Sequence, residues 1–329
     1  MIHQQPTRVR YRDVDVYSMA PSSSGGTTVG EALNILENFN LSRLPRDRAL
    51  HYYLAASGLA FADRNAYVGD PAFVDVPTET LLSQRFANSR ACLIEPDQAP
   101  PAPAPAGDLD ATGCRTGAAT RPAPAGQSTT HLSTADRWGN VVSYTLTIEQ
   151  TGGSGIVVPD RGFLLNNELT DFSAVYDEDD PNRIEPGKRP RSSMSPTIVL
   201  RDGRPWLALG SPGGASIITT VLQTLVNRID FGYSLPQAVA APRASYRNAA
   251  IGTPARPNVQ AEEAFITRYG TALTPYGYTL TLSGDQFTSA ADIGAVAALE
   301  FRRGGAVLAV AEPSRRGGGD AGVVWPVRR

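Results

Sequence analysis

The residue best suited to chemistry in this chain is Thr129, which follows Ser128 where a Pro/Ala/Gly-rich stretch gives way to a strand pattern. Cleavage of the bond between Ser128 and Thr129 would leave a free α-amino group beside the Thr129 hydroxyl, so that one residue supplies both a nucleophile and a base. A free α-amine titrates at about 7.7–8.0, and much of it can therefore accept a proton at neutral pH. The sequence predicts a cleavage site here and a threonine nucleophile, although a plain interdomain spacer has a similar composition.

The nucleophile is expected on the first strand of a β-hairpin. Polar and apolar residues alternate from Thr130 onward, a turn follows at 137–140, and residues 141–148 are rich in β-branched side chains. With a two-residue connection Thr147 lies opposite Thr130, and one further loop residue moves it opposite Thr129. Both registers place Thr147 beside the nucleophile.

A glycine-rich turn could stabilise developing negative charge. Residues 210–214 follow a predicted strand at 206–209 and precede a predicted helix at 216–229. The amides of Gly213 and Gly214 would therefore lie near a helix N-terminus, where N–H groups favour an oxyanion. An ordinary strand-to-helix turn has the same composition, and the turn lacks the Gly-Lys-Ser/Thr ending of a phosphate-binding loop.

Two further segments carry polar groups that could hold the two ends of a ligand. Glu168 and Asp171 follow a predicted strand and could bind an ammonium group through charge-assisted hydrogen bonds, although a solvated turn would contain the same residues. Ser192 and Ser193 could bind a carboxylate or merely cap the local backbone. Taken singly, each segment is more often structural.

Composition limits the classes of function. The chain has 329 residues, of which 41% are hydrophobic and 19% charged, with a formal net charge of −2. These values are typical of a globular protein and argue against a nucleic acid or a membrane surface as the main partner. The three histidines, His3, His51 and His131, are scattered and supply too few ligands for a zinc site, so neither a metal nor another cofactor is expected.

The chain divides into three parts by composition. Residues 1–94 are mainly helical by their apolar spacing, and the spacing of Thr28 and Glu31 predicts a capping box at one helix start. Residues 95–128 carry many Pro, Ala and Gly residues and are predicted to form an exposed linker. Residues 129–329 hold most of the predicted strands, which indicates an α+β fold with helices covering sheets. Cys92 and Cys114 lie in or beside the linker, and the sequence leaves open whether they pair.

Together these motifs closely resemble the γ-glutamyltranspeptidase family. The matching motifs, in order, are Thr-Thr-His at 129–131, Gly-Asn at 139–140, Thr-Ile-Glu at 147–149, Asn-Asn-Glu at 166–168 with Asp-Phe at 171–172, Ser-Ser-Met-Ser-Pro-Thr at 192–197 and Gly-Ser-Pro-Gly-Gly at 210–214. The resemblance extends back through residues 21–26 and 67–71, and it covers nearly all of the chain outside the linker. The Thr-Ile-Glu version is similar to that of Bacillus-type enzymes.

The resemblance implies an N-terminal-nucleophile hydrolase fold, an αββα sandwich made as one precursor that cuts itself into a large and a small subunit. Residues 1–94 would be the C-terminal part of the large subunit, 95–128 the linker, and 129–329 the small subunit. Family precursors carry a long stretch before the point that matches residue 8, so the front of the large subunit is expected to be missing, with the arginine that pairs with the donor carboxylate. The family suggests a periplasmic or secreted protein, although the chain shows no signal peptide.

The implied reaction is attack of Thr129 on the γ-amide of glutathione or another γ-glutamyl donor. The resulting γ-glutamyl ester then passes to water, an amino acid or a peptide. The residues implied to act on the nucleophile and the oxyanion are Thr147, Gly213 and Gly214. The residues implied to bind the donor are Ser192 and Ser193 at its α-carboxylate and Asp171, Glu149 and Glu168 at its α-ammonium.

Three hypotheses remain open on the sequence. The first is an active γ-glutamyl transferase and hydrolase, and the second is an inactive or partner-dependent fragment of the same family. The third, a cephalosporin acylase-like amidohydrolase, is disfavoured because the residues implied to grip the ammonium and carboxylate groups are retained.

Overall fold

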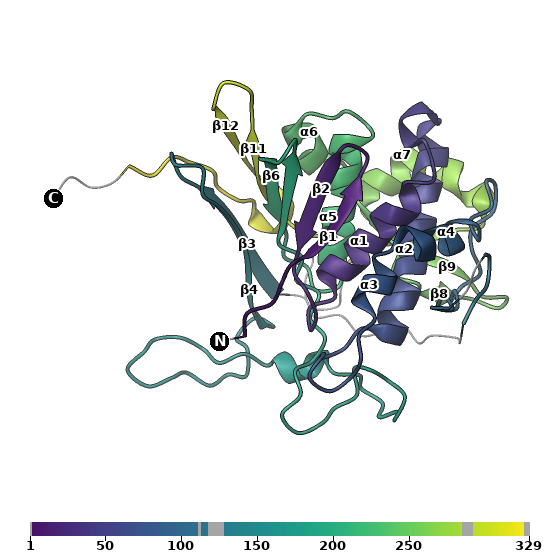
Figure 1. Cartoon of the computed structure of the whole chain (residues 1–329), viewed down its shortest axis with the longest axis horizontal. Helices are drawn as coiled ribbons and strands as arrows, with labels where there is room; N and C mark the ends of the chain where they lie inside the picture. The colour runs from purple at the N-terminus through teal and green to yellow at the C-terminus, as the bar shows by residue number, and fades with distance from the viewer. Residues whose placement is uncertain (1, 111–112, 118–127, 285–291, 326–329) are drawn as a thin grey trace.

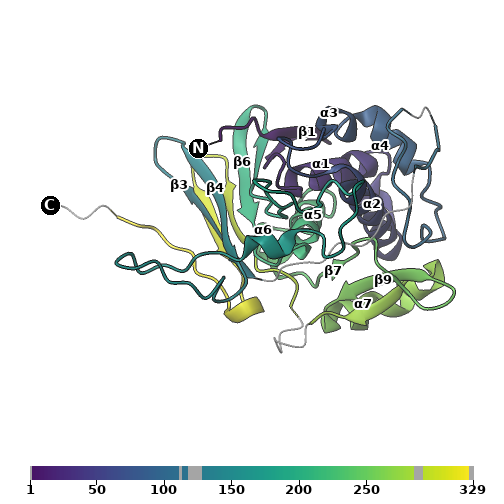
Figure 2. The ribbon, with the colours of Figure 1, turned by 90° about the horizontal axis from the view of Figure 1, so that it is seen from below.

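A six-stranded antiparallel sheet forms the centre of the molecule (Figures 1 and 2). The computed structural model describes residues 2–110, 113–117, 128–284 and 292–325. The strands lie in the order β1-β2-β5-β6-β11-β12. Their bounds are Thr7–Tyr11 for β1, Val14–Ser18 for β2, Thr197–Arg201 for β5, Arg204–Gly210 for β6, Ala297–Phe301 for β11 and Val307–Ala311 for β12. Strands from both sides of Thr129 therefore share one sheet, since β2 pairs with β5.

Helices cover one face of this sheet and bury the apolar core (Figure 1). The helices are α1 (Gly25–Leu36), α2 (Arg46–Tyr67), α3 (Thr78–Leu81), α4 (Gln84–Ala91), α5 (Ser216–Ile229), α6 (Leu235–Ala240) and α7 (Glu263–Leu273). The apolar face of α5 includes Val221 and Leu225, which are fully buried. Each such side chain contributes roughly 1.5–3 kcal/mol by leaving water. A second sheet of β7 (Ala244–Ser245), β8 (Ala250–Ile251), β9 (Arg256–Ala261) and β10 (Thr279–Leu282) lies near α7.

The other face of the central sheet carries the hairpin of β3 (Ser128–Ala135) and β4 (Val141–Glu149). The hairpin turns polar side chains inward: Ser143 Oγ donates to the Leu209 carbonyl at 3.0 Å and accepts from the Thr197 amide at 3.1 Å. Its outer face is apolar and exposed at Leu132, Val142 and Tyr144. No described helix covers that face. The described residues therefore form three layers of the predicted αββα sandwich, namely the helices, the central sheet and the hairpin.

The first helix starts earlier than its sequence predicts. Helix α1 begins at Gly25 with Ser24 as its N-cap, and the Thr28 hydroxyl donates to the Ser24 carbonyl at 2.8 Å. The expected capping box of Thr28 and Glu31 is therefore wrong. A Cβ at residue 25 would lie 2.2 Å from the Met194 carbonyl oxygen, so only glycine allows the helix start to approach residues 192–194 so closely.

Part of the predicted linker is packed rather than exposed. Ala99, Ala104 and Ala106 are buried, and the first two belong to the apolar core. The Ala104 amide donates to Asn248 Oδ1 at 2.6 Å, and Asn248 Nδ2 donates to the Ala104 carbonyl at 2.9 Å. The prediction of an exposed stretch is wrong here because small side chains fit the core and a fixed amide satisfies the backbone. Residues 111–112 and 118–127 of that stretch lie outside the described residues.

Cys92 and Cys114, whose pairing the sequence leaves open, form a disulfide.

None of the described helices is both long enough and apolar enough to span a membrane.

Candidate active site

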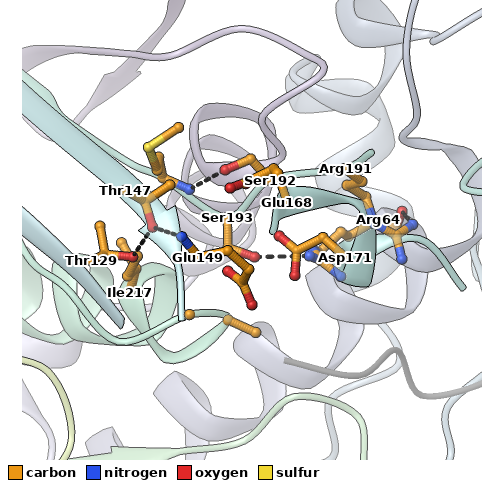
Figure 3. A pocket seen from close by; sticks show the side chains of 13 residues that line it. Arg64, Thr129, Thr147, Glu149, Glu168, Asp171, Arg191, Ser192, Ser193 and Ile217 are labelled. Carbon is orange, nitrogen blue, oxygen red and sulfur yellow. Dashed lines mark hydrogen bonds between the residues drawn. The ribbon is translucent and has the colours of Figure 1, made fainter. Parts of the chain in front are cut away.

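The register of the β3–β4 hairpin, with Thr130 opposite Leu146, places Thr147 beside Thr129, and a β-bulge follows at the end of the hairpin (Figure 3). Ser128 pairs with Glu149 while Thr130 pairs with Leu146, so β4 has one more residue than β3 in the interval between these pairs. Thr129 Oγ1 donates to Thr147 Oγ1 at 3.2 Å, and the Glu149 amide donates to the same oxygen at 2.8 Å. Of the two registers allowed by the sequence, the structure has the one with Thr147 opposite Thr129.

The bulge also turns Glu149 toward two other carboxylates. Glu149 has a φ of +73°, a left-handed conformation that is uncommon for a residue with a side chain and is concentrated at functional sites. Its side chain is buried, and one carboxylate oxygen from each of Glu149, Glu168 and Asp171 lies within 4.8 Å of the others. The 3₁₀ helix Glu168–Asp171 supplies the last two. Elements distant in sequence thus line one pocket with acidic groups.

Burial and mutual repulsion make these carboxyl groups weak acids. Burial, followed by the charges of Asp171 and Glu168, raises the pKa of Glu149 to about 7. Burial and Asp171 raise the pKa of Glu168 to about 7, and burial raises that of Asp171 to about 6. A bound cation would favour the ionised forms of all three.

Ser192 and Ser193 line the same pocket as the three carboxylates and are almost fully buried (Figure 3). The loop before α1 holds this segment, because the amide and hydroxyl of Ser24 both donate to the Ser192 carbonyl at 2.8 Å. Ser23 Oγ donates to the Met194 carbonyl at 2.6 Å. The pocket therefore combines three carboxyl groups with two serine hydroxyls, and Thr129 also lines it.

Gly213 and Gly214 lie between β6 and α5. Their φ angles of +134° and +56° are conformations that favour glycine. Within the described residues, no atom accepts a hydrogen bond from either amide. Gly214 lines the pocket together with Thr129, two residues before the start of α5 at Ser216. The geometry therefore brings Gly214 and Thr129 to one cavity.

Two arginines in the pocket were not expected from the sequence. Arg64, in the last turn of α2, and Arg191 are both buried and both line the cavity (Figure 3). Arg64 Nη2 donates to Ser193 Oγ at 2.9 Å. The sequence signal for Arg64 was a charged residue within the mostly apolar helix α2, because an arginine is rarely buried unless a partner binds it.

The three carboxylates are the described residues best able to hold a metal ion, because their oxygens suit Mg²⁺ or Ca²⁺. Exposed acidic groups are common without an ion, and the expectation of a metal-free, cofactor-free site stays a prediction.

Comparisons with known proteins agree with this geometry. The sequence model of the gamma-glutamyltranspeptidase family matches residues 1–322. The glutathione hydrolase proenzyme of Escherichia coli K12 is 43% identical over 253 residues, which are 74% of this chain and 42% of that protein. The glutathione hydrolase proenzyme of Bacillus subtilis 168 is 45% identical over 240 residues, 71% of this chain and 40% of that protein. The chain thus spans about two fifths of the length of these curated relatives.

A solved structure supports the fold. The crystal structure of cephalosporin acylase from Bacillus halodurans aligns with a TM-score of 0.78 at 27% identity, covering 96% of this chain and 52% of that chain. The architecture is that of the N-terminal-nucleophile hydrolases. The chain belongs to the γ-glutamyltranspeptidase family.

Proposed function

We propose that the chain is the nucleophile-bearing part of a γ-glutamyl transferase and glutathione hydrolase that acts through a threonine ester. The observation that carries the proposal is the Thr129–Thr147 hydroxyl pair on a pocket that is also lined by three carboxylates, two serines and two arginines. A γ-glutamyl group bears an α-ammonium and an α-carboxylate on one carbon. The carboxylates of the pocket are complementary to the first charge, and its serines and arginines to the second.

Maturation would begin with cleavage between Ser128 and Thr129. The products would be a large subunit that ends at residue 128 and a small subunit that begins at Thr129, held together as a heterodimer. The new α-amine would then take the proton of the Thr129 hydroxyl. Thr147 Oγ1 lies 3.2 Å from Thr129 Oγ1, and once that proton has left, the Thr147 hydroxyl would donate to the attacking oxygen and fix its direction.

Attack on the γ-carbonyl of the donor would give a tetrahedral oxyanion. The free amides of Gly213 and Gly214 are the donors we assign to it, and the loss of one such donor costs about 3–4 kcal/mol of barrier. The α-ammonium of Thr129 would return its proton to the leaving amine as the amide bond breaks. Water, an amino acid or a peptide would then attack the γ-glutamyl ester and release Thr129 for another cycle.

Donor binding would use two sets of side chains in the pocket. Glu149, Glu168 and Asp171 would take the α-ammonium, and the hydroxyls of Ser192 and Ser193 the α-carboxylate. Glu149 and the two serines are buried and Glu168 and Asp171 are half-buried, which strengthens these charge-assisted bonds because little water competes for them.

N-terminal sequencing of the purified chain after a denaturing gel tests the nucleophile. Two fragments, one starting at Thr129, and turnover of a γ-glutamyl anilide are expected. Thr129→Ala should abolish both, whereas Thr134→Ala, an exposed threonine on the same strand, should change neither. A single uncut chain without turnover would instead support the inactive or partner-dependent fragment, and turnover that survives Thr129→Ala would overturn the proposal.

An acylase of the cephalosporin type is the second candidate, favoured by the fold it shares with the Bacillus halodurans enzyme. The three carboxylates of the pocket argue against this activity, because a glutaryl group has a carboxylate but no ammonium group that they could bind. Comparison of kcat/KM for a γ-glutamyl anilide and a glutaryl-cephalosporin separates the two. Preference for the glutaryl compound would reverse the assignment.

A further inference from the structure

Arg64 connects the pocket to three separate parts of the fold. Its Nε donates to Ser24 Oγ at 2.8 Å, its Nη1 to Asn65 Oδ1 at 3.0 Å, and its Nη2 to Ser193 Oγ at 2.9 Å. All three acceptors are neutral. None of these hydrogen bonds neutralises the positive charge of the buried guanidinium, and the negative charge that acts on it comes from Asp171 in the same pocket.

The bond to Ser193 decides what that hydroxyl can offer a ligand. A serine hydroxyl has one proton and two lone pairs, whereas a guanidinium can only donate. Ser193 Oγ accepts from Arg64 and therefore keeps its own proton for another acceptor. Ser192 Oγ likewise keeps its proton for another acceptor, because it accepts a hydrogen bond from the Met194 amide at 3.2 Å. Both serines line the pocket and have a proton to give, which suits an acceptor-only group such as a carboxylate.

A second guanidinium adds to the positive charge in this pocket. Arg191 Nη1 donates to the carbonyls of Arg64 at 2.9 Å and Val68 at 3.1 Å, at the end of α2. Its Nε is buried and has no hydrogen-bond partner among the described atoms. Burial and then the neighbouring Arg191 lower the pKa of Arg64 well below its usual range, and burial lowers that of Arg191 to about 10, although the charge of Asp171 opposes both shifts. An anion at the serines would relieve this repulsion.

We propose that Arg64 is a positioning residue that makes the pocket select donors with a free α-carboxylate. It holds Ser193 as an acceptor, so that the hydroxyl proton is directed to the ligand, and it supplies the positive charge behind that proton. The inference rests on the proposed function of the same pocket. A purely structural Arg64 would tie α2 to the serine segment without any preference between donors.

Two donors that differ only in the carboxylate test the inference. A γ-glutamyl anilide carries both charges, whereas a 4-aminobutyryl anilide keeps the ammonium and lacks the carboxylate. We expect Arg64→Gln to raise KM for the γ-glutamyl anilide by about tenfold or more, the size of one lost charge-assisted bond, with a smaller change in kcat. The kcat/KM of the 4-aminobutyryl anilide should stay within about threefold of the parent value. An equal fall in kcat/KM for both anilides would overturn the inference.

Matched variants keep the test decisive. Arg48→Gln, an exposed arginine on the same helix, should leave both donors unchanged. Ser193→Ala should reproduce the loss of carboxylate preference, and its combination with Arg64→Gln should cost no more than the larger single effect. If Arg64→Gln does not fold, Arg64→Lys serves instead, because lysine keeps the charge but cannot make the three hydrogen bonds of the guanidinium. Arg64→Lys should also raise KM for the γ-glutamyl anilide alone.

Calorimetry distinguishes failure of the inference from failure of the proposed function. L-Glutamate should bind more tightly than 4-aminobutyrate, and Arg64→Gln should remove the difference. Such binding without any anilide turnover would support the role of Arg64 and contradict the proposed activity. Turnover with no dependence on Arg64 would contradict the inference alone, and a chain that neither binds nor hydrolyses would contradict both.

Discussion

The imidazole ring of His131 occupies the space that a side chain on residue 210 would need. A Cβ at Gly210 would lie 2.3 Å from the ring, which is held by Thr145 Oγ1 at 2.8 Å from Nδ1 and by Ser133 Oγ at 3.0 Å from Nε2. Burial lowers the pKa of His131 to about 4, so the ring is neutral at physiological pH. The strand that carries Thr129 thus packs through His131 against Gly210, the last residue of β6, and the turn with Gly213 and Gly214 follows directly.

Gly210→Ala should therefore impair catalysis. The added methyl group must displace either the ring or the end of β6, at a cost of about 1–3 kcal/mol in stability. A displacement of this kind beside the residues proposed to react should lower kcat by at least about tenfold. Anilide turnover and thermal unfolding measure the two effects. Gly270→Ala, in a roomier position within α7, is the control and should leave kcat unchanged, and equal kcat values for the two variants would contradict this account.

Donor affinity should rise with pH across the titration of the acidic cluster. Glu149 and Glu168 have pKa values of about 7 and Asp171 about 6, and their charged forms are the ones that hold an ammonium. KM for the γ-glutamyl anilide should fall as pH rises from about 5.5 to 8. A glutaryl anilide, which lacks the ammonium, should not show this fall. A flat KM for the γ-glutamyl donor would argue against ammonium binding by the cluster.

The same cluster should destabilise the empty protein at alkaline pH. The folded pKa of Glu168 lies above its unfolded value, so the folded state binds more protons and its stability falls as pH rises between about 4 and 7. Glu168→Gln removes this penalty. It should raise the free energy of unfolding by roughly 1–3 kcal/mol at pH 8 and leave it nearly unchanged at pH 4. Denaturant unfolding at the two pH values measures the difference, and an equal effect at both would exclude a titration origin.

The Asp70–Arg189 pair should stabilise the segment that leads to the serines. Asp70 Oδ2 accepts from the Arg189 amide at 2.9 Å and from Nε at 3.0 Å, and Oδ1 accepts from Nη2 at 2.6 Å. Hydrogen bonds from Arg189 lower the pKa of Asp70 to about 2. Asp70→Asn should cost about 1–3 kcal/mol at pH 7. Because the folded pKa is depressed, this contribution is complete above about pH 4 and disappears as pH falls through about 2.

Asp15→Asn is the matched control for that measurement. Asp15 pairs with Arg8, whose side chain is 60% exposed, and such surface pairs contribute about 0–1 kcal/mol. Urea titrations of both variants at pH 7 and pH 2.5 compare the two pairs. A loss at Asp70 that persists unchanged at pH 2.5 would show that the carboxylate charge is not its source.

The sequence predicts the local elements better than the long-range contacts. The ends of α5 agree with its apolar spacing, and the period of two locates the hairpin that carries Thr129. Neither pattern selects between the two registers of Thr147, because the choice depends on the length of the turn between β3 and β4, nor do the patterns predict the bulge and the left-handed backbone at Glu149. Local propensity has no means of reporting a conformation that surrounding structure imposes.

Arg64 and the segment around Ala104 illustrate the same limit. A mobile spacer and a packed chain of small residues have nearly the same composition, and the difference here is Asn248, which is 144 residues further along the chain. Arg64 belongs to the pocket only because α2 ends beside Ser193, a contact across 129 residues. Such pairings arise from the tertiary fold and leave no periodic signal in the sequence.

The pairing of β2 with β5 has a consequence for the mature protein. Val16 lies opposite Val199 in that ladder, and these two residues would belong to different polypeptides once the bond before Thr129 is cut. The Cys92–Cys114 link lies wholly on one side of the cut and cannot tether the two products. Unfolding would then become a dissociation, with a midpoint that shifts with protein concentration, and recovery would require a bimolecular encounter.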